Sequence, residues 1–490
     1  MLELPHCTRN PLAVTTLAND LHVSRFGGFF LPQIDPRIAI SLWLAGQSIL
    51  LSIVLSRIRR LATSIPFIFL VALGLRIAFL VYEAHVIPAN VLAYVPFEQE
   101  VGSVAKALAE GRGFCCLFRQ PTGPTAWLVP VYPILLAGIF RVFGVFSLAS
   151  FYAAALLNCI FSALACFPIF SVGKRVSGLP AAASAAWLWA IIPSGILMPT
   201  EWIWDTSLSA LLAATLLWAT LRLAESSCTR DFVGYGALWG LSLLTNPALG
   251  ALFPFHFAWI VYRHYCQGSL RPARLALAVA FLAAMCLPWA VRNTIQFHRL
   301  IPLRSNLSFE LWMGNNEIYD EHSRAVNRIT RFEQVRRYTQ LGESAFLDEK
   351  WQDARQFIRT HPSLTLQLFG RRIVATWLGT ESPQRDFLHP GSPLVAFIFA
   401  WNVFVLVGVV AALARLLILR SPFFVPIAAY PIIFPLVYYL TQTSLRLRHP
   451  CDPVLALMVL ALPIFPLKAA PSHGPRRVPS RWTPGPSLLK

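Results

Sequence analysis

Residues 62–83 of the sequence read ATSIPFIFLVALGLRIAFLVYE, a run of apolar side chains interrupted by one cation, Arg76. A helix that crosses the hydrocarbon core of a bilayer needs about 20 predominantly apolar residues. The run has this length, so it predicts a transmembrane helix. Because a charged side chain inside such a helix is costly when it faces lipid, we expect Arg76 to face other helices.

Similar apolar runs recur along the chain, in which 56% of the 490 residues are hydrophobic and only 13% are charged. This composition excludes an ordinary soluble globular protein. We predict an all-α polytopic membrane protein with about 10 or 11 transmembrane helices. Besides 62–83, the candidate spans lie near 37–56, 149–171, 180–198, 205–221, 232–246, 250–262, 275–290, 393–414, 422–440 and 451–467.

The net charge of +18 comes from 41 Lys and Arg against 23 Asp and Glu, a balance also found in nucleic-acid-binding proteins. Here the cations gather in short segments between apolar runs, which is the pattern of cytoplasmic loops, so we expect no nucleic-acid partner. One long helix through Asn246-Pro247 would reverse the sidedness downstream, but the loop charges require two crossings. The outer face then carries 84–148, 199–204, the turn at Asn246, 291–392 and 441–450.

This topology divides the chain into parts of different character. Residues 1–36 show no signal-peptide pattern, and residues 1–61 are expected to be an N-terminal extension in which the run at 37–56 is either a real extra span or an upstream extension of the reading frame. The nine cysteines show no paired spacing, so free thiols are expected, the adjacent Cys115 and Cys116 included. The further parts are a transmembrane core at 62–290, which includes the first outer loop 84–148, a periplasmic domain of unassigned fold at 291–392, C-terminal transmembrane helices at 393–467, and a disordered basic cytoplasmic tail at 468–490.

The first outer loop contains PFEQEVGSVAKALAEGRGF at residues 96–114. Val101, Val104 and Ala105 fall on one helical face with polar residues opposite, and Gly111 supplies a stop, so we predict an interfacial helix. A second piece, PVYPILLAGIFRVFG at 130–144, is too short for a comfortable span and is expected to lie in the outer leaflet.

Three acids lie on the same predicted face of the membrane. Glu100 belongs to the interfacial helix, where the alternative interpretation is a solvated surface acid. Glu201 and Asp205 belong to EWIWDTSL, between two candidate spans. Asp205 lies at the apolar boundary, where a carboxylate is costly unless it is paired or used. Its alternative role is a helix N-cap, which is compatible with a functional one.

Four cationic or titratable side chains reach this face from later spans. They are Arg292, after PWAV, and Arg446, Arg448 and His449, within SLRLRHP. Arginines at span ends commonly extend to the interface without a further role. A basic cluster in a short outer loop, however, opposes the positive-inside bias and indicates an anionic partner, for which phosphate fits the guanidinium fork.

Several segments together resemble a known family: AKALAEGRGF after Glu100, PTGPTAWLVPVYP, EWIWDTSL, LTNP, PWAVRN and RLRHPCDP. In order and spacing, over roughly 62–467, they look like bacterial membrane glycosyltransferases of the GT-C superfamily, related to the family 39 mannosyltransferases, which use dolichyl-phosphate mannose, and to the lipid A aminoarabinose transferases.

The resemblance implies a multi-pass protein of the bacterial inner membrane with its active site on the periplasmic face. A sugar would pass from a polyprenyl-phosphate donor to a lipid, glycan or protein acceptor. In such enzymes an acid that matches Glu100 is catalytic, and a second one, which Asp205 matches, assists or helps hold a metal. Arginines that match Arg292, Arg446 or Arg448 hold the lipid phosphate, with His449 and Glu201 beside them. The Tyr that usually follows the first acid is missing. No cofactor is therefore assigned, the binding of a divalent metal ion stays an open possibility, and Glu98 is the reserve candidate for the catalytic acid.

Two other functions stay open. A transporter should show an internal repeat and matching helix breaks, whereas one break, at Asn246-Pro247, is found. A flippase for lipid-linked glycans would use the arginines to bind phosphate but would not require Glu100 and Asp205. A scaffold requires neither set of residues.

Overall fold

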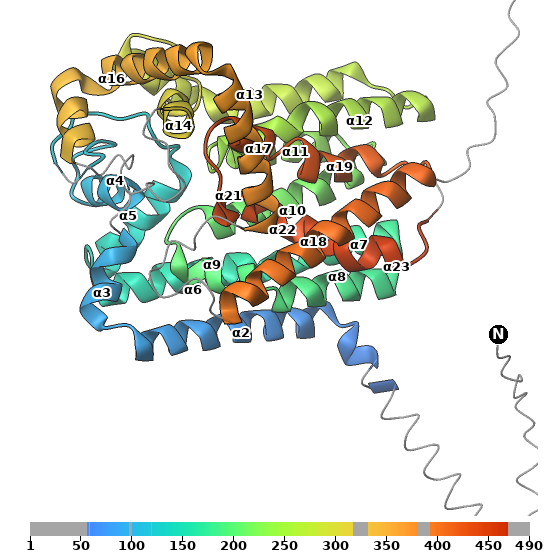
Figure 1. The fold of residues 1–490 in the computed structure, drawn as a ribbon. Helices are drawn as coiled ribbons and strands as arrows, with labels where there is room; N and C mark the ends of the chain where they lie inside the picture. The colour runs from blue at the N-terminus through green and yellow to red at the C-terminus, as the bar shows by residue number, and fades with distance from the viewer. Residues whose placement is uncertain are drawn as a thin grey trace, which may run out of the picture. The chain divides into compact units, whose positions relative to one another are not determined.

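The computed structural model describes residues 56–57, 59–97, 100–118, 120–316, 332–379 and 393–468. Contacts divide the chain into two units, Met1–Ala62 and Thr63–Lys490, and the fold below is that of the second unit. Helices make up this unit, and no strand occurs among its described residues, which confirms the predicted all-α fold (Figure 1). Residues 37–55 of the first candidate span, Glu98 and nearly all of the tail lie outside the described residues.

Six helices of the described part are long and apolar enough to cross a membrane, so the protein is a multi-pass membrane protein. A bent pair with an angle of 43° makes a seventh span if its two helices cross together. The six are α2 (Ile65–Val86), α6 with α7 (Leu148–Leu164 and Cys166–Val176), α10 (Thr206–Leu223), α13 (Pro272–Phe297), α18 (Pro393–Ile418) and the stretch Leu445–Ile464, and the bent pair is α8 (Leu179–Ile191) with α9 (Pro193–Glu201).

The other apolar runs predicted as spans form shorter helices. α11 (Thr229–Leu243) and α12 (Phe253–Gln267) have 15 residues each. Between them, Oδ1 of Asn246 accepts a hydrogen bond from the backbone N–H of Ala248 at 3.1 Å and starts the 3₁₀ helix η4 (Pro247–Leu252). The chain therefore breaks at Asn246, as the loop charges predict, and does not form one long helix.

Arg76 in α2 is fully buried, as the sequence predicts. Its Nη1 donates to the carbonyl of Ala190 at 3.2 Å and its Nη2 to that of Trp189 at 3.2 Å. In an unbroken helix the carbonyl of Trp189 would accept from residue 193, but this residue is Pro193 and has no N–H. Arg76 thus supplies the donors that are missing where α8 bends into α9.

The C-terminal part is broken into short helical pieces by prolines. Pro435, Pro450 and Pro453 begin or interrupt these pieces, of which η6 packs against α8 and α18. The pieces are α19 (Phe424–Ile432), α20 (Leu436–Leu440), α21 (Leu445–Arg448), the 3₁₀ turn η5 (His449–Cys451), α22 (Asp452–Ala456), the π-helical η6 (Leu457–Ala461) and α23 (Leu462–Ile464).

The elements of the predicted outer face share an apolar core of their own, apart from the core between the spans. Figure 1 shows α4 and α5 beside α16 and α14, away from α2. These elements are α3 (Ala89–Tyr94), η3 (Val95–Phe97), α4 (Glu100–Ala109), α5 (Val131–Phe143), α14 (Leu307–Gly314) and α16 (Phe332–Thr360). α17 (Pro362–Leu378) instead packs against α18 and α20, with Trp377 in the core between the spans. In the segment 291–392, whose fold the sequence leaves unassigned, two consecutive helices, α16 and α17, are separated by a break at His361.

Candidate active site

A cavity of about 820 Å³ lies where the outer elements meet the ends of several spans. Its size falls within the range of small-molecule sites, roughly 300–1,000 Å³. Glu100, Asp205 and Arg446, which the sequence places on one face of the membrane, all line this cavity. The cavity therefore brings together two acids and one cation that are far apart in the sequence. Glu100 and Arg446 are separated by 346 residues, from position 100 to position 446.

Glu100 is the first residue of α4 and lines the cavity from that helix. Val101, Val104 and Ala105 are buried as predicted, but Ser103, predicted on a polar face, is also buried, because α4 packs against α5 on one side and borders the cavity on the other. Burial raises the pKa of the Glu100 carboxyl, the nearby charge of Glu310 raises it further, and Arg446 and Arg304 oppose this rise. A carboxylate with a raised pKa is a stronger base.

Asp205 directly precedes α10, at the N-cap position. Its side chain makes no capping hydrogen bond there; instead, its Oδ2 accepts from Oγ of Ser209 at 2.8 Å. Nδ2 of Asn246 donates to the same Ser209 hydroxyl at 3.3 Å. The carboxylate is therefore fixed by a hydroxyl one turn into the helix and remains at the cavity wall, where it is available for chemistry.

Arg446 is held by aromatic faces. Its guanidinium lies 4.2 Å from the centroid of the Trp202 ring and 5.1 Å from that of Trp204. Stacking of this kind orients the planar guanidinium without using its N–H donors. Within the described part of the chain these N–H groups donate no hydrogen bond, so they can bind an anion in the cavity.

Two further charged residues of the cavity were not identified from the sequence. Arg304 forms an ion pair with Glu310 at 3.5 Å. The carboxylate of Glu310 also accepts hydrogen bonds from Nδ2 of Asn306 at 2.8 Å and from Nε2 of Gln442 at 2.5 Å. Glu310 thereby joins α14 to the loop before α21 and fixes the position of Arg304, the second cation of the cavity.

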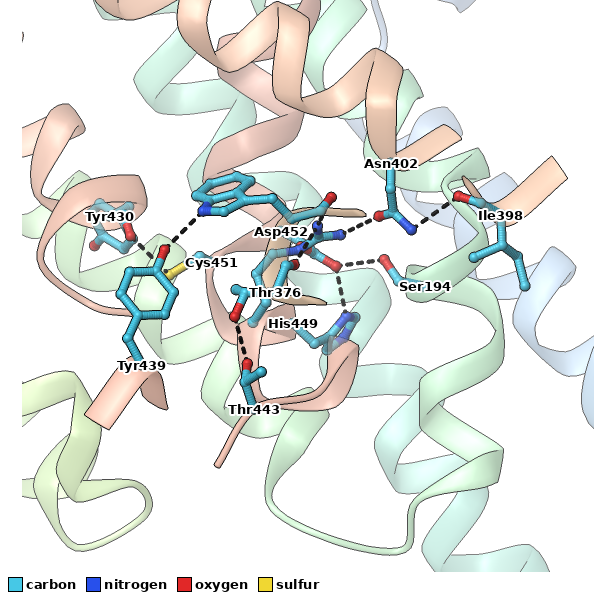
Figure 2. A network of polar contacts seen from close by, with 12 residues as sticks. Ser194, Thr376, Ile398, Asn402, Tyr430, Tyr439, Thr443, His449, Cys451 and Asp452 are labelled. Carbon is cyan, nitrogen blue, oxygen red and sulfur yellow. Dashed lines mark hydrogen bonds and ion pairs between the residues drawn. The ribbon is translucent and has the colours of Figure 1, made fainter. Parts of the chain in front are cut away.

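Arg448 and His449 lie in a separate, buried polar network, shown in Figure 2. Arg448 pairs with the carboxylate of Asp452 at 3.2 Å and donates to Oδ1 of Asn402 at 2.8 Å. Nδ1 of His449 and the hydroxyl of Ser194 contact the other carboxylate oxygen of Asp452, at 3.2 and 2.7 Å. The anionic partner that the sequence indicates for Arg448 is thus a residue of the chain itself.

Arg292 and Glu201 are also not among the residues that line the cavity. Arg292 donates to the backbone carbonyls of Thr125 at 2.6 Å and Phe114 at 2.9 Å, so it holds the first outer loop. Glu201 is the last residue of α9 and is partly buried. Of the seven residues predicted from the sequence, the structure therefore brings three into one cavity.

The sequence leaves undecided whether the protein binds a metal ion. In the ranges that the structure describes, no three His, Cys, Asp or Glu side chains are grouped to hold a metal ion. The acids of the cavity are engaged separately, Asp205 by Ser209 and Glu310 by Asn306 and Gln442. We therefore assign no step to a metal.

No protein-family model and no curated protein matches the chain. Among solved structures, it is similar to the Archaeoglobus fulgidus oligosaccharyltransferase in complex with Zn and sulfate, with a TM-score of 0.47 and 16% identity over 81% of this chain and 48% of that one. It is also similar to the enzyme from that organism, AglB, with an inhibitory peptide and a dolichol-phosphate (TM-score 0.44, 16% identity, 76% and 46% covered).

A third similar structure is ArnT from Cupriavidus metallidurans bound to undecaprenyl phosphate, with a TM-score of 0.33 and 13% identity over 79% of this chain and 77% of that one. The chain spans about half the length of the archaeal enzyme. All three are membrane glycosyltransferases of the GT-C superfamily, the class that the sequence motifs indicate. With TM-scores below 0.5, they do not specify chemistry for this chain, and its function follows from its own residues.

Proposed function

We propose that the protein is a membrane glycosyltransferase that moves a sugar from a polyprenyl-phosphate donor to a hydroxyl of a lipid, glycan or protein acceptor. The observation that carries this proposal is the convergence of Glu100, Asp205 and Arg446 on one cavity. A base, a second acid and a cation with free donors are the groups that such a transfer requires.

Glu100 acts as the general base. Its carboxylate takes the proton of the acceptor hydroxyl while the acceptor oxygen forms a bond to the anomeric carbon of the sugar. The bond from that carbon to the phosphate oxygen breaks at the same time, and its electrons leave with the polyprenyl phosphate. The raised pKa of Glu100 suits this role because proton transfer is most effective when the pKa of the base lies near the working pH.

Arg446 stabilises the phosphate that departs. Negative charge grows on this group in the transition state, and a guanidinium already oriented by Trp202 and Trp204 needs little reorganisation to meet it. Arg304, fixed by Glu310, adds a second positive charge to the cavity. Asp205 orients the acceptor or the sugar hydroxyls, with its carboxylate steadied by Ser209.

The lipid part of the donor would remain in the bilayer, because the cavity lies next to the ends of the spans. By the distribution of loop charges, this is the outer side of the membrane. The family resemblance implies that this is the periplasmic side of a bacterial inner membrane. Arg292, Arg448, His449 and Glu201, which were predicted to bind substrate, have no direct contact with it in this proposal. The partners are therefore the polyprenyl-phosphate sugar, the surrounding lipid and the acceptor.

The test is sugar release from a labelled panel of polyprenyl-phosphate donors, in membranes that contain wild-type protein or Glu100→Gln. We expect the wild type to consume at least one donor and the variant to bind it but to turn it over at least 100-fold more slowly, roughly the contribution of a general base. Glu110→Gln is the matched control, since Glu110 lies just after the same helix but is exposed and pairs with Lys106 and Arg112.

Donors that bind without being consumed by the wild type would contradict the proposal. That outcome would favour the alternative, a flippase or transporter of lipid-linked glycans that lacks transferase chemistry. Full turnover by Glu100→Gln would remove Glu100 from the role of base.

A further inference from the structure

Glu343 is a buried acid whose side chain accepts four hydrogen bonds. Its Oε1 accepts from the backbone N–H of Ala126 at 2.9 Å and from Oγ of Ser305 at 2.7 Å. Its Oε2 accepts from Oγ1 of Thr125 at 2.5 Å and from the hydroxyl of Tyr338 at 2.7 Å. A carboxylate has about four acceptor positions, so every one of them is occupied by a donor.

The four donors come from three segments that are far apart in the sequence. Thr125 and Ala126 belong to the first outer loop, Ser305 to the stretch between α13 and α14, and Tyr338 to α16. The loop and the stretch are also joined directly, because the N–H of Ser305 donates to the carbonyl of Ala126 at 2.9 Å. Glu343 is thus the point at which these three segments meet.

Arg292 holds the same loop from the other side. Its Nη1 donates to the carbonyl of Thr125 while the Thr125 hydroxyl donates to Glu343, so one residue is fixed through its backbone and its side chain. The guanidinium of Arg292 is itself stacked near the rings of Trp289 and Phe114, at 5.1 and 5.6 Å. The cation also offsets part of the electrostatic cost of the buried Glu343 carboxylate.

Each of the joined segments continues directly into the cavity wall. Trp127 directly follows Ala126, Arg304 directly precedes Ser305, and Val335 lies one turn before Tyr338. Trp127, Arg304 and Val335 all line the cavity. α16 is broken at Gly342, whose φ of +74° is in the left-handed region, and across this break the Tyr338 hydroxyl reaches the Glu343 carboxylate.

We propose that Glu343, with Arg292, is a positioning residue that fixes this wall of the cavity, an inference that rests on the transferase function proposed above. Glu343 reaches the reacting groups only through Arg304 and the outer loop. When it is lost, the wall should loosen and the bound substrates should be less well aligned, because a displacement of about 1 Å at a reaction centre can slow the reaction by roughly 100-fold.

The test uses Glu343→Gln in the full-length protein. The glutamine can keep a carbonyl oxygen on the Ala126 N–H and on Ser305, but its amide N–H₂ then meets the hydroxyls of Thr125 and Tyr338, which must turn to accept, and all four bonds lose their charged acceptor. We expect hydrogen exchange at the amides of Ala126 and Ser305 to become roughly tenfold faster or more, since buried bonds to a charged acceptor are among the stronger ones. We also expect kcat to fall roughly tenfold or more while the KM for the donor changes less than about twofold. Glu333→Gln, at an exposed position of α16, is the control and should change neither.

Unchanged exchange at Ala126 and Ser305 in folded Glu343→Gln protein would overturn the proposal. If that variant does not fold, Thr125→Val and Ser305→Ala decide, since each removes one donor and keeps the carboxylate. Wild-type kcat and exchange in both would contradict the assigned role. If the wild type consumes no donor at all, the proposed function fails. The exchange measurement then still tests whether Glu343 holds the three segments together.

Discussion

The guanidinium of Arg446 lies 4.2 Å from the ring centroid of Trp202. Arg446 belongs to α21, which begins at residue 445, 243 residues after Trp202 in the chain. Trp204 lies near the same guanidinium at 5.1 Å. The two tryptophans provide orientation and low polarity, while the N–H donors remain directed to the cavity. This arrangement depends on a flat, delocalised cation, which lysine lacks.

We therefore predict that Arg446→Lys lowers kcat/KM for the donor roughly tenfold although it keeps the charge, and that Arg446→Ala lowers it roughly 100-fold. Trp202→Leu should resemble Arg446→Lys. Steady-state kinetics with the donor found above measures this. Arg263→Lys is the control, since Arg263 stacks near Trp259 at 6.0 Å away from the cavity. Wild-type activity in Arg446→Lys would show that stacking has no role.

The pH dependence of the reaction should follow Glu100. Because its pKa is raised by burial and by Glu310, the active carboxylate form is lost as the pH falls through a value above the usual range of glutamate, about 4.3. The acid limb of the profile of kcat/KM against pH should lie there. In Glu310→Gln one cause of the raised pKa is removed, so the limb should move to lower pH. A limb that stays in place or moves to higher pH would contradict the assignment of Glu100 as base.

Asp452 does not line the cavity, but its loss should lower the stability of the protein. Asp452→Asn leaves Arg448 buried without its carboxylate and weakens the contacts to His449 and Ser194 (Figure 2). Loss of one partner of a buried ion pair costs about 3 to 5 kcal/mol, which unfolding in detergent can measure. Asp348→Asn breaks an exposed pair with Arg299 and should cost less than about 1 kcal/mol. Equal losses in both variants would argue against the buried network.

Gly314 permits a close approach that another residue would block. A Cβ at this position would lie 1.6 Å from the carbonyl oxygen of Thr441, beside Gln442. Gly314→Ala should therefore force α14 away from this loop, weaken the bond from Gln442 to Glu310, and lower stability by about 1 to 3 kcal/mol together with activity. Gly370→Ala, in α17 with open space around it, should be neutral or slightly stabilising. Thermal unfolding and donor turnover of both variants distinguish local crowding from a general effect of alanine.

The sequence placed Glu100, Asp205 and Arg446 on one face of the membrane because loop charge and apolar length determine sidedness. It could not separate Arg446 from Arg448. In the short helix α21, residues two apart point about 200° from each other, so Arg446 faces the cavity while Arg448 turns inward to Asp452. That helix was not predictable from the apolar pattern, because its four residues precede the apolar run at 451–467, into which the chain continues through η5.

Arg304 and Glu310 were missed for a different reason. They lie in a long outer segment, where charges carry no information about topology and where many other arginines are equally plausible candidates. A signal was present in the pairing of Arg304 with Glu310 at a spacing of six residues, but this spacing matches no single helical face. Only the turn at Asn306, which precedes α14, brings the two side chains together.

Arg76 has a consequence for how the protein is made. Apart from one bond to the carbonyl of Ala72 in its own helix, its hydrogen-bond partners lie far along the chain: Ser162, Trp189 and Ala190 are 86, 113 and 114 residues further on. At the centre of a single inserted helix, an arginine costs about 2.5 to 3.5 kcal/mol on biological insertion scales. α2 must therefore enter the membrane before its cation is fully satisfied, carried by its apolar residues, and the arrival of the bent pair α8 and α9 completes the insertion of a helix synthesised much earlier.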